Sequence, residues 1–520
     1  MLILEAIGLE MFMEGKTAWE AASETAAKTA SERYLAKLAR KAFLSLWSYP
    51  NVYTDEGRAK GKGDGKELCD LLVVFGHHVL IFSDKACAFP DHPDIKVAWG
   101  RWYKSAVDKS VKQLVGAEKF LRAHPDRLFL DKTCSAPFPI PLPDPTSARI
   151  HRIAVTRGSN AAAHEYWDKQ SSGSLMIDTS VEGLAAHLDV PFTIGWPGSK
   201  ERFIHVLDEM TLDVLLEELD TLPDLIAYLE AKERFLTAVP FVSVAGEEQL
   251  VARYQMTMKD NKHALPEVPE GFDSLCLGEG DWEYYCTSQE RVLRREADRG
   301  SYMWDELIEY QSGFIRSGKA HSLSEMPMQG ADHERVVRAL ADEARFSRRL
   351  LAHGLRGALE QNRAGHKFAR LLPSATNPER CYVFLIAPRL PDISYDEYRA
   401  LRAELLLTYC HALKLKYPAF LEAVGIASEP MIEAHSSQDF VVVSLDQPLT
   451  EEDECLLREA CEEYGVLQDD TMIERPFRAT EYPRPYAGPH PQDAALVAMN
   501  RAMRRAMARH ERRTKKDRRG

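Results

Sequence analysis

Several kinds of motif are missing from this chain of 520 residues, and each absence excludes a class of protein. No apolar run approaches the roughly 18 residues that suffice for a membrane-spanning helix, so we expect no membrane partner. The first residues, Met-Leu-Ile-Leu-Glu-Ala-Ile, lack the basic region and the length of a secretory signal peptide. The expected compartment is therefore the cytoplasm.

Cysteine is sparse, and its spacing shows no metal-binding pattern. The nine cysteines are odd in number, scattered, and never spaced as Cys-x-x-Cys. This distribution predicts reduced thiols, and we do not expect a zinc ribbon. The glycine-rich segment 57–66 also lacks the Gly-x-x-x-x-Gly-Lys-Ser/Thr spacing of a phosphate-binding loop, so ATP binding is not indicated.

The chain is acidic overall, but its basic residues are concentrated in two places. The net charge is −13, while the last twenty residues hold ten Lys or Arg against two acids, which leaves about −21 on the rest. The basic tail is interpreted either as a tether for a phosphate backbone or as a solubilising end. The second basic patch, segment 57–66, supplies the candidate nucleic-acid contacts Arg58, Lys60, Lys62 and Lys66.

The most informative stretch is an expected β-hairpin over residues 68–75 and 79–85. Two apolar runs flank a Gly-His-His turn, which is typical of buried antiparallel strands. Asp70 opens the first strand and Lys85 closes the second, and Ser83 shares a strand face with Lys85. A carboxylate that holds Mg²⁺, beside an ammonium that orients water or offsets phosphate charge, is the apparatus of a phosphodiesterase.

This pattern of Asp, apolar run, Gly, apolar run and Lys resembles the core of the PD-(D/E)XK, or restriction-endonuclease-like, nucleases, most closely their NERD- and Mrr-like branches. The resemblance covers roughly the first 160 residues. It implies an α-β-β-β-α-β order, which fits an amphipathic helix at 17–48, the hairpin, a second helix at 99–122 and a strand at 150–155. It also implies that Ser83 stands where the family has an acid, with Asp84 facing the other side of the strand.

The resemblance assigns roles to further residues. Glu32, in the first helix, is the candidate for the family's helical glutamate, and Gln113, in the second, for a glutamine near the metal. Either Glu32 or Glu67 is a possible replacement for the acid missing at position 83. His77 and His78 are interpreted as turn residues, because no third metal ligand can be placed from the sequence. The predicted catalytic set is Asp70, Lys85, Ser83, Glu32 and Gln113, and the predicted ligands of Mg²⁺ or Mn²⁺ are Asp70, Glu32 and Glu67.

The length and the 45% hydrophobic content predict a globular chain of two to four domains. The fold class expected is α/β and α+β, with a restriction-endonuclease-like mixed sheet flanked by helices. The predicted divisions are a nuclease-like domain at 1–160, a mostly helical middle region at 161–330, an α+β domain at 331–475, and a Pro-rich linker with a basic helix at 476–520. Short apolar pieces at 174–177, 192–195 and 203–207 are candidate strands that would extend the nuclease sheet, up to about residue 245.

Two functions follow as hypotheses. The first is a Mg²⁺-dependent nuclease acting on DNA or RNA, for which the resemblance implies a setting such as bacterial restriction or phage defence. The second is a nuclease fold that has lost catalysis, as Ser83 indicates, and that serves as a nucleic-acid-binding or protein-interaction scaffold. Nucleic acid is the expected partner in the first case, and the C-terminal regions are available for a protein partner or a second copy of the chain.

Overall fold

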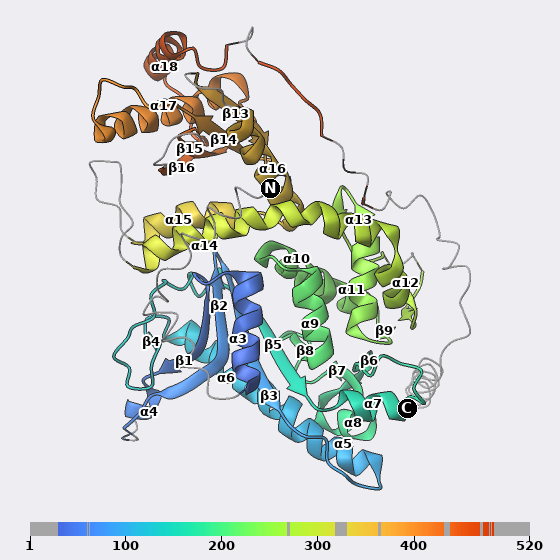
Figure 1. The fold of residues 1–520 in the computed structure, drawn as a ribbon. Helices are drawn as coiled ribbons and strands as arrows, with labels where there is room; N and C mark the ends of the chain where they lie inside the picture. The colour runs from blue at the N-terminus through green and yellow to red at the C-terminus, as the bar shows by residue number, and fades with distance from the viewer. Residues whose placement is uncertain are drawn as a thin grey trace. The chain divides into compact units, whose positions relative to one another are not determined.

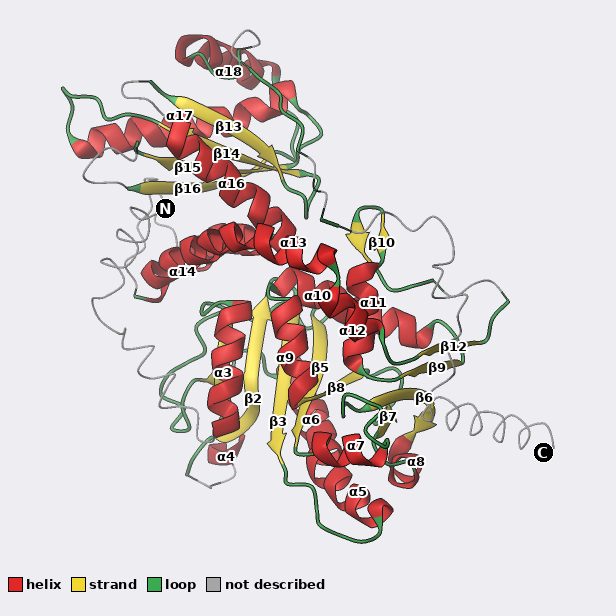
Figure 2. Ribbon diagram, turned by 45° about the vertical axis from the view of Figure 1, so that its right-hand side comes forward, coloured by secondary structure: helices red, strands yellow, loops and turns green. Residues whose placement is uncertain are grey.

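The computed structural model describes residues 30–482, apart from 60, 62, 268–270, 318–329, 362–365, 431–436, 469–471, 478 and 480. The chain is a mixed α/β protein with several sheets (Figure 2). It divides into two compact units, the first holding the described residues up to 220 with 225–286, and the second holding 221–224 with 287–482. None of the described helices is long and apolar enough to cross a bilayer.

The first unit is built on a six-stranded mixed sheet of order β4-β1-β2-β3-β5-β8 (Figure 1). Strands β4, β1, β2 and β3 pair antiparallel, whereas β3, β5 and β8 run parallel. The strands are β1 (Ser48–Thr54), β2 (Lys66–Phe75), β3 (His78–Ala86), β4 (Leu128–Phe129), β5 (Arg149–Arg157) and β8 (Ile204–Asp208).

The predicted hairpin is confirmed, and β2 and β3 form the centre of this sheet. The register runs from Leu71 opposite Phe82 to Phe75 opposite His78. Gly76 and His77 make the turn, and Gly76 has a φ of 58°, a left-handed conformation that glycine adopts without strain. The strand predicted at 150–155 is also confirmed as β5.

Helices cover both faces of the hairpin. Helix α3 (Ala30–Phe43) lies across one face, where Phe43 meets Phe82 with ring centroids 6.0 Å apart (Figure 1). The segment predicted as a helix at 99–122 forms α5 (Ile95–Tyr103), a π-helical segment (Lys104–Asp108) and α6 (Lys109–Ala123). Helix α6 covers the opposite face through Leu114 and Ala117, which share a core with Ile81. The part of the first predicted helix at 17–29 lies outside the described residues.

The order implied by the resemblance includes a strand ahead of the hairpin, but its residues were not predicted, because Pro50 marks only the end of a helix in the sequence. The structure places Pro50 opposite Leu71 in the β1–β2 ladder. A proline has no N–H to donate, so it is tolerated in a strand where one side lacks a partner. Strand β4 pairs with β1 only at Tyr53 and Thr54, which leaves the outer side of Pro50 free of a ladder.

An internal ion pair fixes α6 to the sheet. Arg152 of β5 donates to Glu118 of α6 with Nε–Oε2 and Nη2–Oε1 distances of 2.7 and 2.6 Å. Both side chains are about nine-tenths buried. Burial alone raises the pKa of Glu118, but the hydrogen bonds from Arg152 and Arg122 hold it below its usual value. This bidentate pair sets the position of the helix that carries Gln113.

The first unit also contains a second sheet of order β12-β9-β6-β7. The prediction that short apolar pieces extend the first sheet therefore holds for β8, whereas the pieces at 174–177 and 192–195 belong to the second sheet. The region 161–330, predicted to be mostly helical, contains several strands beside its helices. The remaining elements of this unit are α4 (Glu56–Ala59), α7 (Asn160–Tyr166), β6 (Met176–Glu182), α8 (Gly183–Asp189), β7 (Thr193–Trp196), α9 (Glu209–Glu218), α10 (Leu222–Thr237, which begins in the second unit), β9 (Phe241–Val244), α11 (Glu247–Met256), the short hairpin β10 (Met258–Lys259) and β11 (Lys262–His263), β12 (Ser274–Leu277) and α12 (Asp281–Thr287).

The second unit combines helices with a four-stranded sheet of order β13-β14-β15-β16. Its arginines form internal ion pairs. Arg345 and Arg348 both bond to Asp305, with Nη–Oδ distances of 2.8 and 2.6 Å, and Arg402 is fully buried against Asp439. The elements are α13 (Gln289–Asp298), α14 (Tyr302–Arg316), α15 (Gly330–Ala341), α16 (Arg345–Gln361), β13 (Phe368–Pro373), β14 (Arg380–Ile386), α17 (Tyr395–Lys416), β15 (Glu422–Ser428), β16 (Gln438–Ser444) and α18 (Glu451–Tyr464).

Candidate active site

The hairpin brings Asp70 and Lys85 together at the end opposite its turn. Lys85 Nζ lies 3.3 Å from Asp70 Oδ2, and the backbone N–H of Asp84 donates to the same oxygen at 2.7 Å. Both of these contacts use Oδ2 and not Oδ1. The Asp70 side chain is 5% exposed and that of Lys85 is 29% exposed, so the pair stands at the boundary between core and solvent.

Two further predicted residues lie on the same face. The Ser83 hydroxyl is fully buried and lies 3.0 Å from Gln113 Oε1 and 3.2 Å from Ser110 Oγ. Gln113 and Ser110 both come from α6, one turn apart, so the helix that covers this face of β3 also presents its polar groups there. Asp70, Ser83, Lys85 and Gln113 thus occupy one end of the α6 face of the sheet.

Asp84 points to the opposite face, as the alternation of a strand predicts. Its carboxylate is paired with Arg157 of β5, with Nε–Oδ1 and Nη2–Oδ2 distances of 3.1 and 3.3 Å. The Asp84 side chain has no solvent exposure in this pair. Asp84 therefore cannot take the place of the acid that Ser83 does not provide.

Burial raises the pKa of Asp70 to about 6, even though Lys85 and the Asp84 N–H favour its charged form. The negative charge of Glu67, at the start of β2, raises it further. Glu67 therefore lies close enough to Asp70 to affect it electrostatically. The backbone of Glu32 is part of α3, but its side chain lies outside the described residues, and its predicted role stays a prediction.

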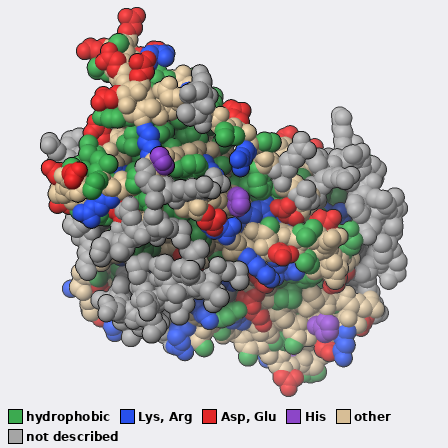
Figure 3. Space-filling model, turned by 45° about the horizontal axis from the view of Figure 1, so that its top comes forward, with side chains coloured by type: hydrophobic (Ala, Val, Ile, Leu, Met, Phe, Trp, Pro, Cys, Tyr) green, Lys and Arg blue, Asp and Glu red, His purple; other side chains and the backbone are tan. Residues whose placement is uncertain are grey.

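The basic segment 57–66 ends at Lys66, which is the first residue of β2 and lies at this same end of the hairpin. Lys66 is 65% exposed and lies 3.0 Å from Glu56 Oε2, while the exposed Arg58 donates to the carbonyl oxygen of Thr133. Lys60, Lys62 and the basic tail at 501–520 lie outside the described residues. On the face drawn in Figure 3, basic and acidic side chains are interspersed, in keeping with the acidic net charge.

The donors at this site fit a hard divalent cation in part. Mg²⁺ in proteins is usually held by one or two carboxylates, with water and substrate phosphate as its other ligands. Asp70 supplies one buried carboxylate whose Oδ1 is not used by the two contacts above. Ser83 and Gln113 add neutral oxygens, and Glu67 adds negative charge nearby. One carboxylate is the smallest number that Mg²⁺ usually takes from a protein.

We expect Ser83→Glu to make the stability of the protein depend on divalent cation. Position 83 is fully buried beside Asp70, so a second carboxylate there meets both desolvation and like-charge repulsion. The thermal midpoint in EDTA should fall below that of the wild type, and Mg²⁺ should restore part of the loss and increase cleavage.

The matched control is Ser83→Gln, which adds nearly the same volume without the charge. Differential scanning fluorimetry of both variants with Mg²⁺ and with EDTA separates crowding from charge. Equal responses of the two variants to Mg²⁺ would show that no cation is held at this position.

One group of polar residues was missed by the sequence interpretation. His77 is a turn residue as predicted, but His78 is the first residue of β3 and its ring stacks on His151 of β5 with centroids 5.4 Å apart. His205 of β8 lies next in the same row, and two glutamates of α10 face these rings. A single histidine in each of three apolar strands was the only indication of this cluster in the sequence.

Comparison with known proteins adds no relative. No protein-family model, no curated protein and no solved structure matches this chain.

Proposed function

We propose that this protein is a Mg²⁺-dependent nuclease that hydrolyses phosphodiester bonds of DNA or RNA. We also propose that the sheet around β2 and β3 is a restriction-endonuclease-like core. The order α3-β1-β2-β3-α6-β5, with one helix on each face of the hairpin, supports the fold.

The observation that carries the proposal is the 3.3 Å contact between Asp70 and Lys85. A buried carboxylate with a raised pKa beside a partly exposed ammonium is an unfavourable arrangement for stability alone. Clusters of perturbed titratable groups at a solvent boundary are typical of functional sites. The uncharged oxygens of Ser83 and Gln113 on the same face give a metal and a phosphate further partners.

The residues divide the chemistry between them. Asp70, through Oδ1, would hold the ion, which when bound polarises the phosphate and lowers the pKa of a water. The Lys85 ammonium stands where it offsets the charge that develops on the phosphate oxygens. Asp84 contributes only its backbone N–H, which fixes the rotamer of Asp70. Gln113 and Ser110 hold the Ser83 hydroxyl and exclude bulk water from the floor of the site.

A second candidate function rests on one specific residue. Ser83 supplies no charge for a metal, so a nuclease fold without catalysis, acting as a nucleic-acid-binding scaffold, is the alternative. A single assay distinguishes the two functions: the full chain is incubated with labelled single- and double-stranded DNA and RNA. Cleavage in Mg²⁺ that disappears in EDTA supports the nuclease, and binding of the same substrates without cleavage in Mg²⁺ or Mn²⁺ supports the scaffold.

A further inference from the structure

A second cluster of ligand-type side chains lies at the other end of the sheet from Asp70 and Lys85. His78 begins β3, and Lys85 lies seven positions after it, which is roughly 23 Å along a strand. His151 and His205 come from the adjacent parallel strands β5 and β8. Neighbouring Arg152 bonds to α6, so by alternation His151 points to the opposite face, toward α10.

The inner part of this cluster has the spacing of a metal site. His205 Nε2 lies 3.1 Å from Glu233 Oε1, and His151 Nδ1 lies 3.6 Å from the same oxygen. The ligand atoms of these three residues are all within 4.8 Å of one another. Ligands bound tetrahedrally to Zn²⁺ at 2.0–2.1 Å are about 3.3 Å apart, and the two distances to Glu233 bracket that value.

One ligand atom is otherwise unexplained. His151 is 1% exposed, and its buried Nδ1 has no described partner within hydrogen-bond distance, since Glu233 Oε1 lies 3.6 Å away. A buried polar atom without a partner costs about 1–3 kcal/mol, so such atoms are uncommon in folded proteins. A cation between His151, His205 and Glu233 would give this atom a partner.

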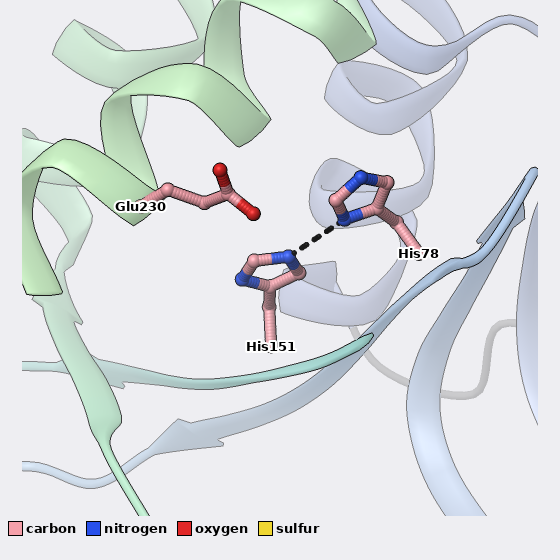
Figure 4. Close-up of side chains that lie close together, drawn as sticks. All are labelled: His78, His151 and Glu230. Carbon is pink, nitrogen blue, oxygen red and sulfur yellow. Dashed lines mark hydrogen bonds between the residues drawn. The ribbon is translucent and has the colours of Figure 1, made fainter. Parts of the chain in front are cut away.

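The ring of His78 contacts one nitrogen of His151 and leaves the other nitrogen facing Glu233. His78 Nδ1 lies 3.1 Å from His151 Nε2, and Figure 4 shows the two rings joined at that contact. In the tautomer in which His151 Nε2–H donates to His78 Nδ1, the lone pair of His151 is on Nδ1 and points to Glu233. A partner that orients a ligand in this way is characteristic of metal-binding histidines.

Two glutamates of α10 face the rings, and their surroundings differ. Glu230 points toward His78 and His151 in Figure 4, but Arg149 Nε already lies 2.7 Å from its carboxylate. Arg149 is farther from Glu233, with an Nη2–Oε2 distance of 3.8 Å. Glu233 is therefore the carboxylate with more negative charge to offer a cation.

We propose that His151, His205 and Glu233 form a binding site for a Zn²⁺-class cation, with His78 as the residue that orients His151. Two imidazoles and a carboxylate favour zinc and similar transition metals over Mg²⁺ or Ca²⁺. Three protein ligands leave a fourth position for water, and Glu233, which is 26% exposed, stands on the solvent side. The ion joins β5 and β8 to α10 and is independent of the proposed nuclease site.

The test is a titration of the full chain with Zn²⁺ against a chromophoric chelator. We expect one tightly bound equivalent, with affinity reduced at least tenfold in Glu233→Gln and in His205→Ala. His78→Ala should weaken binding by 10–100-fold, the range seen when a partner of a metal ligand is removed. Glu230→Gln is the matched control and should retain the affinity within about threefold.

The same variants exclude binding elsewhere on the chain. All nine cysteines remain in Glu233→Gln, so zinc held by thiols would bind this variant as tightly as the wild type. Zn²⁺ should also raise the thermal midpoint of the wild type and of Glu230→Gln, but not that of Glu233→Gln. The isosteric glutamine keeps the packing, so this comparison remains valid if the alanine variants fail to fold. Equal zinc affinity in the wild type and Glu233→Gln, or loss of affinity in Glu230→Gln alone, would overturn the assignment.

Discussion

Lys85→Met is expected to lower the rate of cleavage by about 10²–10³-fold, the usual effect of removing one group that stabilises transition-state charge. Methionine keeps most of the apolar stem of a lysine that is 29% exposed, so the hairpin should remain intact. Nucleic-acid affinity should change little, because one charge among many phosphate contacts contributes a small share of binding. Single-turnover cleavage and filter binding measure the two quantities separately.

The structure supplies a matched control for this variant in Lys66. Its side chain is 65% exposed at the same end of the hairpin, but its nearest described carboxylate is Glu56 and not Asp70. Lys66→Met should leave the single-turnover rate close to that of the wild type and reduce only the salt dependence of binding.

Loss of Lys85 should also raise the pKa of Asp70, because the Lys85 ammonium is the largest influence that lowers that pKa. The acid limb of any residual activity should therefore move to higher pH, and an unchanged rate in Lys85→Met would place the chemistry elsewhere.

Asp70→Asn is expected to abolish Mg²⁺-dependent cleavage and at the same time to stabilise the fold at neutral pH. Loss of a metal ligand removes several kcal/mol of transition-state stabilisation, which is about 10³-fold in rate. The gain in stability follows from the pKa of Asp70, which is raised to about 6 in the folded protein. Asparagine fills the same space without a charge that is costly to bury.

The pH dependence of that stability has a definite sign. Between the unfolded pKa of about 3.9 and the folded pKa of about 6, the native state binds more protons at Asp70 than the unfolded state does. The free energy of unfolding therefore falls as pH rises through this window, by about 1–3 kcal/mol in total. Asp208, whose pKa burial also raises to about 6, contributes a similar fall in both proteins. In urea denaturation at several pH values, the wild type should therefore lose more stability across this window than Asp70→Asn does.

Asp84→Asn is the control, because it should lower stability and retain cleavage, which are the opposite effects to those of Asp70→Asn. It removes the buried partner of Arg157 on the other face of β3, so it should lower stability by several kcal/mol. The Asp84 backbone N–H that holds Asp70 is unaffected, so cleavage by the folded fraction should persist. A loss of activity in Asp84→Asn equal to that in Asp70→Asn would remove the distinction between the two faces.

The sequence was sufficient to predict the centre of the site because that part of the structure is local. Asp70 and Lys85 are joined by a short turn, and the alternation of β3 assigns Ser83 and Asp84 to opposite faces. Gln113 was a candidate because the resemblance implies a glutamine on this helix near the metal. The predictions for Asp70, Lys85, Ser83 and Asp84 depend on contacts within one hairpin.

The rest of the structure depends on pairings between segments far apart in the sequence, and no local sequence pattern encodes these pairings. His151 and His205 meet only because β5 pairs with β3 and with β8 in parallel, across long connections. The apolar pieces at 174–177 and 192–195 resemble strands of the first sheet, and only their pairing assigns them to the second. Likewise, the sequence does not give the partners of the arginines of α16, two of which the fold pairs with Asp305.

The central claim is that Asp70 and Lys85 carry metal-dependent cleavage of nucleic acid. It is tested most directly by incubating the full chain with end-labelled single- and double-stranded DNA and RNA in Mg²⁺, Mn²⁺, Ca²⁺ or EDTA, beside Asp70→Asn. We expect cleavage of at least one substrate in Mg²⁺ or Mn²⁺, none in EDTA, and none by Asp70→Asn in any metal. Cleavage by Asp70→Asn at the rate of the wild type, or intact substrates in every metal, would contradict it.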